Sequence, residues 1–491
     1  MSAAYHSLAE KHREIALIQS TSSILDWDQE TNLPRKALNY RAEQLSYLSG
    51  KIHQLSTSAD YQKSLETAEN AGAADTLQKA NLREWRHQFD RSQKLSQNLV
   101  ERDSKTCTLA KSAWIEARKQ ADFSLFAPHL SKLLELSKEK AQRWGYQDEA
   151  YDALLDNYER GAKTKDIVRI FSQYEPELEQ LASAAVAKSQ HSAARSLKGS
   201  FPIASQIKLN QQIAESIGFD FDAGRIDTTT HPFCTTLGPQ DIRLTTRYDE
   251  TDFTSSLFGV MHEMGHGLYE QGLRSSDFGL PSGTAVSLGI HESQSLLWEA
   301  HVGRSPSFWK HWLPCAQELF PQLQDWSLEE FLNTINQARY SYIRVDADEA
   351  TYDLHIMLRF DIERRLLNNE LKVDDVPAAW NERFEKLFGM QPESDAQGCL
   401  QDIHWAMGGL GYFPTYTLGN LNASQLFHAA TQKPEIQKAF NEANFSPLLD
   451  WMKTHIHSLG SVYLPQDLML QATGEATTSA YHLAHLKQRY L

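Results

Sequence analysis

Two histidines four residues apart, with a glutamate beside the first, lie near the middle of the chain in GVMHEMGHGLYEQG (259–272). On a helix, residues i and i+4 share one face about 6 Å apart, so His262 and His266 can both reach one metal ion. Glu263 points off that axis but stays close enough to take a proton from a water molecule beside the ion. This H-E-x-x-H pattern therefore predicts a zinc site with two protein ligands and a general base.

The competing interpretation is a solvated helix face that happens to carry these polar residues. Apolar residues recur at helical spacing on both sides of the motif, which places the helix in the interior, where two unpaired imidazoles would be costly. Gly265 and Gly267 each weaken a helix by about 1 kcal/mol relative to alanine. They indicate that another part of the backbone approaches closely. Both observations favour the metal site.

A catalytic zinc site needs a third protein ligand. An extended H-E-x-x-H-x-x-G-x-x-H pattern is excluded because Tyr269 and Gly272 occupy its last glycine and histidine positions. Glu270 lies on the same helix, but its position carries it away from the ion. Glu292 begins a second amphipathic segment after a turn-forming loop, so that segment can fold back antiparallel and present its carboxylate. Glu299, two turns further on, is the weaker candidate.

The elements that position these residues follow from periodicity. Residues 1 to about 217 show helical spacing almost throughout, and helical spacing returns from 252 to about 370. Between them, 224–250 is rich in threonine, alternates polar with apolar residues and has a central Gly-Pro turn, which predicts a β-hairpin. We expect a single domain over 1–491, with the metal-site helices at about 252–302.

Composition narrows the class of protein. The chain has 491 residues with 41% hydrophobic and 23% charged side chains, typical of a globular protein with a large core. A net charge of -15 argues against nucleic acid or anionic membranes as partners. The N-terminus lacks an apolar signal segment, and nowhere do about 18 apolar residues run together, so a cytoplasmic protein is expected. The four scattered cysteines fit reduced thiols.

Several segments match the motifs of one peptidase family in the family's order. They are W-D-x-x-T-x-M-P at 27–34, with Leu33 in place of the usual methionine; HPF at 231–233; D-x-R-x-T at 241–245; HEMGHGLYEQG followed by HESQS; I-R-x-x-A-D at 343–348; and G-x-x-Q-D-x-H-W at 398–405. From residue 27 to about 416, the chain therefore resembles the carboxypeptidase Taq family of metallocarboxypeptidases.

The resemblance implies a mainly α-helical, saddle-shaped metallopeptidase of the gluzincin type, with a deep cleft and a small β-sheet beside the metal site. It also implies a homodimer and one divalent metal ion per subunit, zinc or, in vitro, cobalt. It assigns the metal to His262, His266 and Glu292 and the general base to Glu263. Members of this family remove single residues from peptide C-termini with broad preference and poor tolerance of proline.

Cleavage at a free C-terminus requires a cation that binds the terminal carboxylate, and the planar fork of arginine suits this task. Arg243, in the expected hairpin, and Arg344, in an expected helix, are the candidates. Either could instead form a structural ion pair, with Asp241 or Asp348 as partner. The edge of a sheet beside the metal could also bind the peptide by strand addition.

The oxyanion that forms during peptide hydrolysis is usually stabilised by a neutral donor as well as by the metal. His231, His404, Tyr412 and Tyr416 are available, and the family resemblance favours His404 and Tyr416. The alternative is an aromatic segment packed into the core with its polar tips satisfied.

The sequence thus predicts a zinc-dependent metallocarboxypeptidase acting on peptides. One alternative is an oligoendopeptidase with the same metal centre. The other is a helical binding or scaffold protein whose metal site is structural or vestigial, although structural zinc sites usually fill all four positions with protein ligands.

Overall fold

The computed structural model describes residues 2–192 and 194–491, which are mainly helical with one small sheet, as predicted. The chain divides into two compact units. Unit 1 comprises Met1–Ser92, Arg195–Ile335 and Asn422–Thr477, and unit 2 comprises Gln93–Ala194, Asn336–Leu421 and Thr478–Leu491. In the part of the chain that the structure describes, no helix is both long and apolar enough to cross a bilayer. All four cysteines are free thiols.

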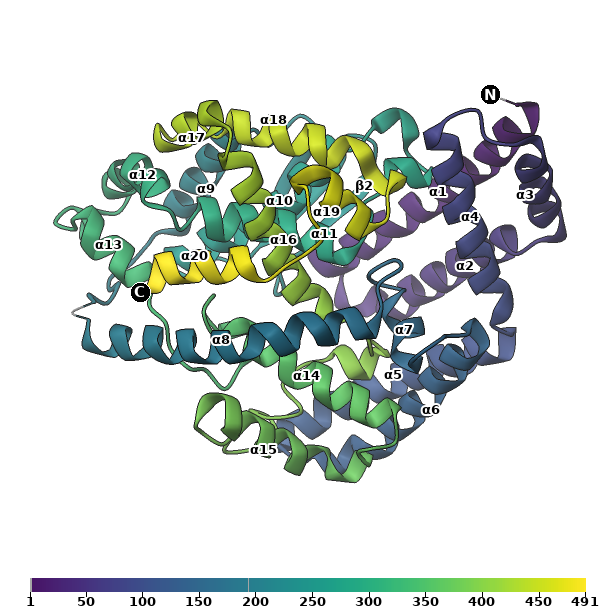
Figure 1. Cartoon of the computed structure of the whole chain (residues 1–491), viewed down its shortest axis with the longest axis horizontal. Helices are drawn as coiled ribbons and strands as arrows, with labels where there is room; N and C mark the ends of the chain where they lie inside the picture. Colours follow the sequence, from purple (N-terminus) through teal and green to yellow (C-terminus); the bar gives the residue numbers. More distant parts are fainter. Residues whose placement is uncertain (1, 193) are drawn as a thin grey trace. The chain divides into compact units, whose positions relative to one another are not determined.

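Unit 1 carries the H-E-x-x-H segment and the only sheet of the described residues (Figure 1). Its elements are α1 (Ala3–Thr31), α2 (Leu38–Ser56), α3 (Ala59–Ala71), α4 (Thr76–Lys94), α9 (Ile203–Ile217), β1 (Gly224–Thr228), β2 (Cys234–Gly238), β3 (Asp241–Thr246), α10 (Phe253–Gly272), α11 (Leu288–Leu296), η5 (Leu297–Val302), α12 (Pro306–Leu319), α13 (Leu328–Ile335), α17 (Pro434–Asn441), α18 (Ser446–His455) and α19 (Pro465–Thr473). Its main core joins α9, the sheet, α10 and α12.

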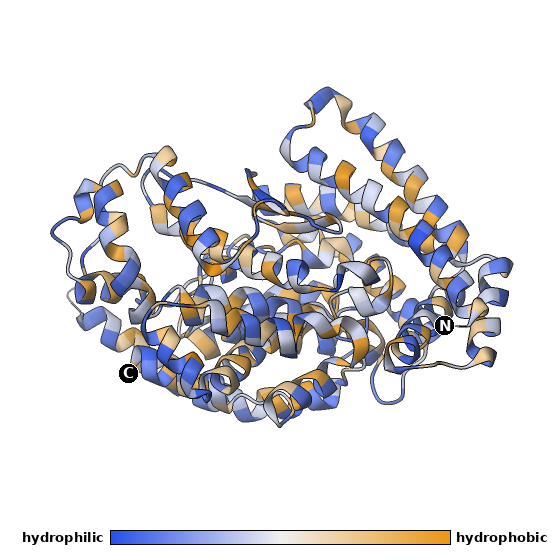
Figure 2. Ribbon diagram, turned by 90° about the horizontal axis from the view of Figure 1, so that it is seen from above, coloured by the Kyte–Doolittle hydropathy of each residue, from blue (hydrophilic) through white to orange (hydrophobic). Residues whose placement is uncertain are grey.

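Unit 2 is helical and has a core of its own. Its helices are α5 (Gln97–Gln120), α6 (Ala127–Trp144), α7 (Ala150–Leu155), α8 (Thr164–His191), α14 (Tyr352–Leu367), α15 (Val376–Phe388) and α20 (Ala480–Tyr490), and α16 (Pro414–Thr431) begins in this unit. In Figure 2 most helices carry both hydrophobic and hydrophilic stretches, the pattern of amphipathic helices that pack on a core.

The segment expected to be a hairpin forms a three-stranded sheet of order β1-β3-β2. β2 and β3 pair antiparallel and make a hairpin, but β1 pairs parallel to β3, with Arg225 opposite Arg243. Because side chains alternate along a strand, Ile242 and Leu244 face α10, and Arg243 faces the other way. β2 is an edge strand, and the carbonyl of Leu237 on it accepts a hydrogen bond from Ser20 of α1.

The helical region expected from 252 to about 370 is interrupted between α13 and α14. At several positions here, a side chain takes the place of a carbonyl oxygen as the acceptor for a backbone N–H group. Asp348 accepts from the N–H groups of Arg339, over 2.7 Å, and Ala350, over 2.9 Å. Gln401 accepts from the N–H of Arg344 over 2.8 Å. The prediction of a helix at Arg344 was therefore wrong beyond the single 3₁₀ turn Arg344–Asp346.

α10 and α11 pack at backbone contact distance, which explains the glycines of the motif. A methyl group on Gly265 would lie 2.5 Å from the carbonyl oxygen of Gln294 and 2.6 Å from Cα of Ser295, both on α11. The loop between the two helices is anchored by buried Asn81, which accepts from the N–H of Ser282 over 2.7 Å. The close approach inferred from the sequence is thus the contact between the two helices that carry the predicted metal ligands.

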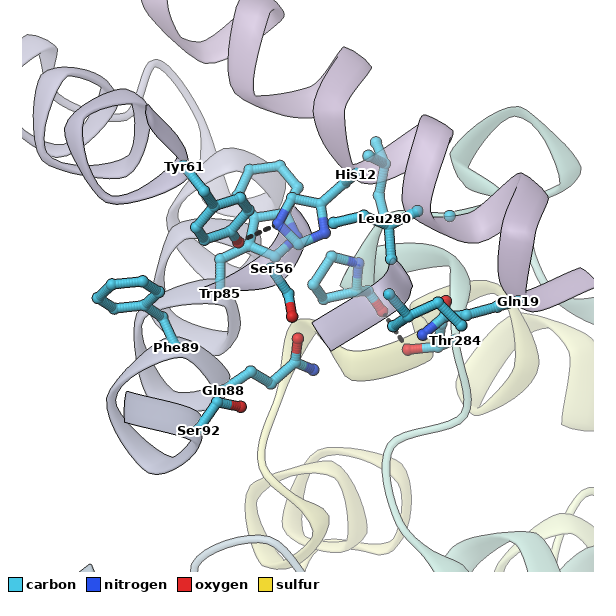
Figure 3. Close-up of a pocket in the computed structure, with 14 residues that line it drawn as sticks. His12, Gln19, Ser56, Tyr61, Trp85, Gln88, Phe89, Ser92, Leu280 and Thr284 are labelled. Atoms are coloured by element: carbon cyan, nitrogen blue, oxygen red, sulfur yellow. Dashed lines mark hydrogen bonds between the residues drawn. The ribbon is translucent and has the colours of Figure 1, made fainter. Parts of the chain in front are cut away.

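The same loop packs against the N-terminal helices, beside an aromatic cluster (Figure 3). The His12 ring stacks on Trp85 with centroids 4.4 Å apart, and its Nε2 bonds to the hydroxyl of Tyr61. Burial lowers the pKa of His12 to about 3, so the ring is neutral at pH 7. A cavity of about 410 Å³ lies beside this cluster, and Leu280 and Thr284 of the loop also line it.

Candidate metal centre and substrate-binding residues

The structure brings together the three predicted metal ligands. α10 begins at Phe253, where the side chain of Asp252 caps the N–H of Thr254, and it presents both histidines on one face. Nε2 of His262 lies 3.7 Å from Oε1 of Glu292, and Nε2 of His266 lies 3.6 Å from Oε2 of the same carboxylate. One donor atom from each residue falls within 4.8 Å of the other two.

The chemistry of these donors fits a divalent cation such as zinc. Nδ1 of His262 is 2.9 Å from a carboxylate oxygen of Glu299, and Nδ1 of His266 is 3.0 Å from the carbonyl oxygen of His291. Because both partners are acceptors, Nδ1 of each ring carries a proton, and Nε2, which faces Glu292, is the nitrogen that can bind a metal ion once it is deprotonated. Donors about 2.1 Å from a tetrahedral ion lie about 3.4 Å apart, close to the separations observed.

The two histidines of the site differ in their electrostatic surroundings: burial, together with the neighbouring His291 and His262, lowers the pKa of His266 well below its ordinary value. Burial lowers the pKa of His262, but the carboxylates of Glu292 and Glu299 outweigh burial and raise it to about 10. Burial is also the largest influence on the buried Glu263, and with Glu292 it raises that pKa to about 7. A carboxylate with a pKa near neutrality can both accept and return a proton, as a general base requires.

Glu299 contacts His262, one of the predicted metal ligands. After α11 the chain makes the π-helical turn η5, which aims Glu299 at Nδ1 of His262. The other oxygen of Glu299 lies 3.5 Å from the guanidinium group of Arg304, which stacks over Phe258 at 3.9 Å. Sequence reasoning treated Glu299 only as a possible ligand and missed Arg304. A carboxylate one to two turns past a metal ligand is a usable signal for such a partner.

Two further sequence candidates belong to unit 1. His231 is exposed in the loop before β2 and makes no hydrogen bond or ion pair with another residue that the structure describes. Arg243 forms a two-point ion pair with Asp241, at 2.9 and 3.1 Å, and lies 4.2 Å over the ring of Trp27. The ion pair anticipated as the alternative for Arg243 is therefore present.

Arg344 belongs to unit 2 and is buried with Asp402 as its partner, whereas the sequence suggested Asp348. Its Nε and Nη2 lie 3.1 and 2.9 Å from Oδ1 of Asp402, and Nη1 donates to the hydroxyl of Tyr352 over 2.6 Å. Arg359, fully buried, binds the other oxygen of Asp402. One carboxylate thus faces two guanidinium groups, and this cluster keeps a net positive charge.

His404 and Tyr416 form a pair beside this cluster. Nε2 of His404 is 3.2 Å from the hydroxyl of Tyr416, and the Arg344 guanidinium lies 4.9 Å over the ring of Tyr416. Burial lowers the pKa of His404 to about 4, so the imidazole is neutral near pH 7. The structure therefore gathers Arg344, His404 and Tyr416, which the sequence separates by up to 72 positions (416 minus 344), into one cluster within unit 2.

A helix pair that offers two histidines and a glutamate to one point, with a buried glutamate beside them, defines a helical metallopeptidase. The chain belongs to the carboxypeptidase Taq (M32) metallopeptidase family, whose sequence profile matches residues 7–490. It is 39% identical to thermostable carboxypeptidase 1 of Thermus thermophilus, with 99% of this chain and 98% of that protein aligned. It is 36% identical to carboxypeptidase 1 of Bacillus subtilis, with 97% and 96% aligned.

Solved structures agree with this family. The M32 carboxypeptidase from Deinococcus radiodurans superposes with a TM-score of 0.96 at 35% identity, covering 100% of this chain and 99% of that one. Trypanosoma cruzi metallocarboxypeptidase 1 gives 0.96 at 33% identity, with 99% of each chain covered. The protein is a metal-dependent carboxypeptidase and hence a peptide hydrolase, and neither the endopeptidase nor the scaffold alternative is favoured.

Proposed function

We propose that the protein is a zinc carboxypeptidase that releases single residues from peptide C-termini, with His262, His266 and Glu292 as the metal ligands. The proposal rests chiefly on the 3.6 and 3.7 Å separations between the histidine Nε2 atoms and the Glu292 oxygens. Two nitrogens and one carboxylate are the donor set of many catalytic zinc sites, which keep one position open. Cobalt accepts the same ligands and can substitute.

Zinc held by these residues would supply Lewis acidity and would make a nearby water molecule more acidic. Glu263 directly follows the proposed ligand His262 on α10 and is buried, so we assign it to remove a proton from that water and to return it to the leaving amine. His404 and Tyr416 are neutral hydrogen-bond donors, and we assign them, with His231 as the weaker candidate, to the oxyanion.

The test of the general base is Glu263→Gln in the full chain. The amide cannot accept the proton, so kcat should fall by about 10²–10⁴-fold, the usual contribution of positioned proton transfer. Zinc content should stay at one ion per chain, measured by elemental analysis. Retained turnover with retained zinc would contradict the assignment.

Exopeptidase action is tested by comparing a peptide with its C-terminally amidated form. The free acid should be cleaved far faster, because an arginine binds the terminal carboxylate. Arg243→Met and Arg344→Met then identify that arginine, since the responsible variant should raise KM for the free acid and lose the preference over the amide. Equal cleavage of both peptides by the unaltered enzyme would favour the endopeptidase alternative.

Other properties that follow from the family resemblance are predictions of the same proposal. We expect broad preference for the C-terminal residue, slow release next to proline, a homodimer and a cytoplasmic location. A panel of peptides that differ only in the last residue tests the first two, with released amino acids as the readout. Sedimentation velocity and cell fractionation test the others.

A further inference from the structure

His291 immediately precedes the proposed ligand Glu292, but its ring lies against the other ligand-bearing helix. The imidazole stacks on that of His266, with centroids 4.4 Å apart and 26° between the ring planes. Its backbone carbonyl oxygen lies 3.0 Å from Nδ1 of His266. One residue therefore contacts both the face and the Nδ1 edge of a metal ligand.

The ring of His291 is itself held in place. Its Nε2 lies 3.0 Å from Oε1 of Glu270, one turn beyond His266 on α10. The other oxygen of Glu270 accepts a 2.7 Å hydrogen bond from the hydroxyl of Thr236 on β2. The contacts run from the sheet through Glu270 and His291 to His266.

We infer that Thr236, Glu270 and His291 form a positioning chain that fixes the ring plane of His266. A single hydrogen bond at Nδ1 fixes the tautomer but leaves the ring free to rotate about that contact, and a stacked neighbour removes this freedom. His262 differs, because it has a carboxylate, Glu299, directly on Nδ1. The inference rests on the proposed metal centre, since positioning matters only if His266 is a ligand.

The end of the positioning chain that is farther from His266 is accessible to small molecules. Glu270 and Thr236 line a cavity of about 540 Å³ that Asp220 and Lys453 also line. A Glu270→Ala variant would therefore leave room for acetate or formate where the carboxylate had been. Chemical rescue by these anions separates a positioning role from a general loss of folding.

The experiment measures zinc affinity of the purified full chain by competition with a chromophoric chelator. Glu270→Ala and His291→Ala should each weaken zinc binding about ten- to a hundredfold, the usual effect of losing an outer partner. Acetate should restore at least a tenth of the zinc affinity that Glu270→Ala has lost. It should leave the zinc affinity of His291→Ala unchanged. Asp220→Asn, which alters the same cavity, should bind zinc as the unaltered protein does.

Two further variants keep the inference open to refutation. His291→Phe preserves stacking and should bind zinc more tightly than His291→Ala, and its cobalt form should retain more of the visible absorption of the unaltered protein. Thr236→Val, nearly isosteric, should weaken zinc binding severalfold even if the alanine variants fail to fold. The positioning chain is refuted if the folded variants bind zinc as tightly as the unaltered protein. It is also refuted if acetate does not change the zinc affinity of Glu270→Ala. Tight zinc binding by His262→Ala would instead overturn the metal centre itself.

Discussion

Replacing Gly265 by alanine should separate the two helices that carry the proposed metal ligands, and so weaken metal binding without altering any of those residues. The added methyl group would lie 2.5 Å from the Gln294 carbonyl oxygen, where ordinary contact begins at 3.4 Å. Because that atom is backbone, α11 must move by about 0.9 Å, several times the tolerance of about 0.2 Å for ligands at a metal site. Glu292 moves with the helix, so zinc affinity should fall by at least the roughly ten- to a hundredfold that loss of an outer partner costs.

Stability should change less than affinity. Overpacking costs about 1–3 kcal/mol, and the gain in helix propensity offsets about 1 kcal/mol of it. Gly259→Ala on the same helix is the matched control, because its methyl group would meet only the Thr246 hydroxyl at 3.5 Å. Chelator competition and thermal unfolding of both variants test the prediction. Gly265→Ala with the zinc affinity of the unaltered protein would show that contact between α10 and α11 does not set the ligand geometry.

Three further predictions concern charge and metal. Glu299→Gln should weaken zinc binding about ten- to a hundredfold, because it removes the carboxylate on His262, and unchanged affinity would refute that role. Burial raises the pKa of Asp402, but Arg359 and Arg344 outweigh burial and lower the pKa well below its ordinary value. Ionised Asp402 therefore stabilises the folded protein above pH 4. This stabilisation is lost only as the pH falls through the lowered pKa of Asp402 in the folded state. Asp402→Asn should cost about 3–5 kcal/mol at pH 7, and that deficit in urea unfolding should shrink in strong acid. Chelation of a zinc-loaded sample should lower the unfolding temperature, and zinc should restore it.

The residues of the H-E-x-x-H motif were predictable because their relation is local. A helix places His262 and His266 on one face whatever surrounds it, and Gly265 signalled a close backbone neighbour before the neighbour was known. Glu292 could be anticipated because one turn-forming loop separates two amphipathic helices, and the structure places its carboxylate between the histidines. Periodicity also gave the mainly helical fold, since it depends on residues only a few positions apart.

Pairings between distant segments were decided only by the tertiary structure. Arg344 is paired with Asp402, 58 positions away, and the nearby Asp348 instead binds backbone N–H groups and interrupts the predicted helix. The parallel addition of β1 and the stacking of His291 on His266 likewise have no periodic signal. Local sequence sets which faces are apolar and which residues can bind metal. The partner of each buried charge depends on which segments the packed core brings within hydrogen-bond distance.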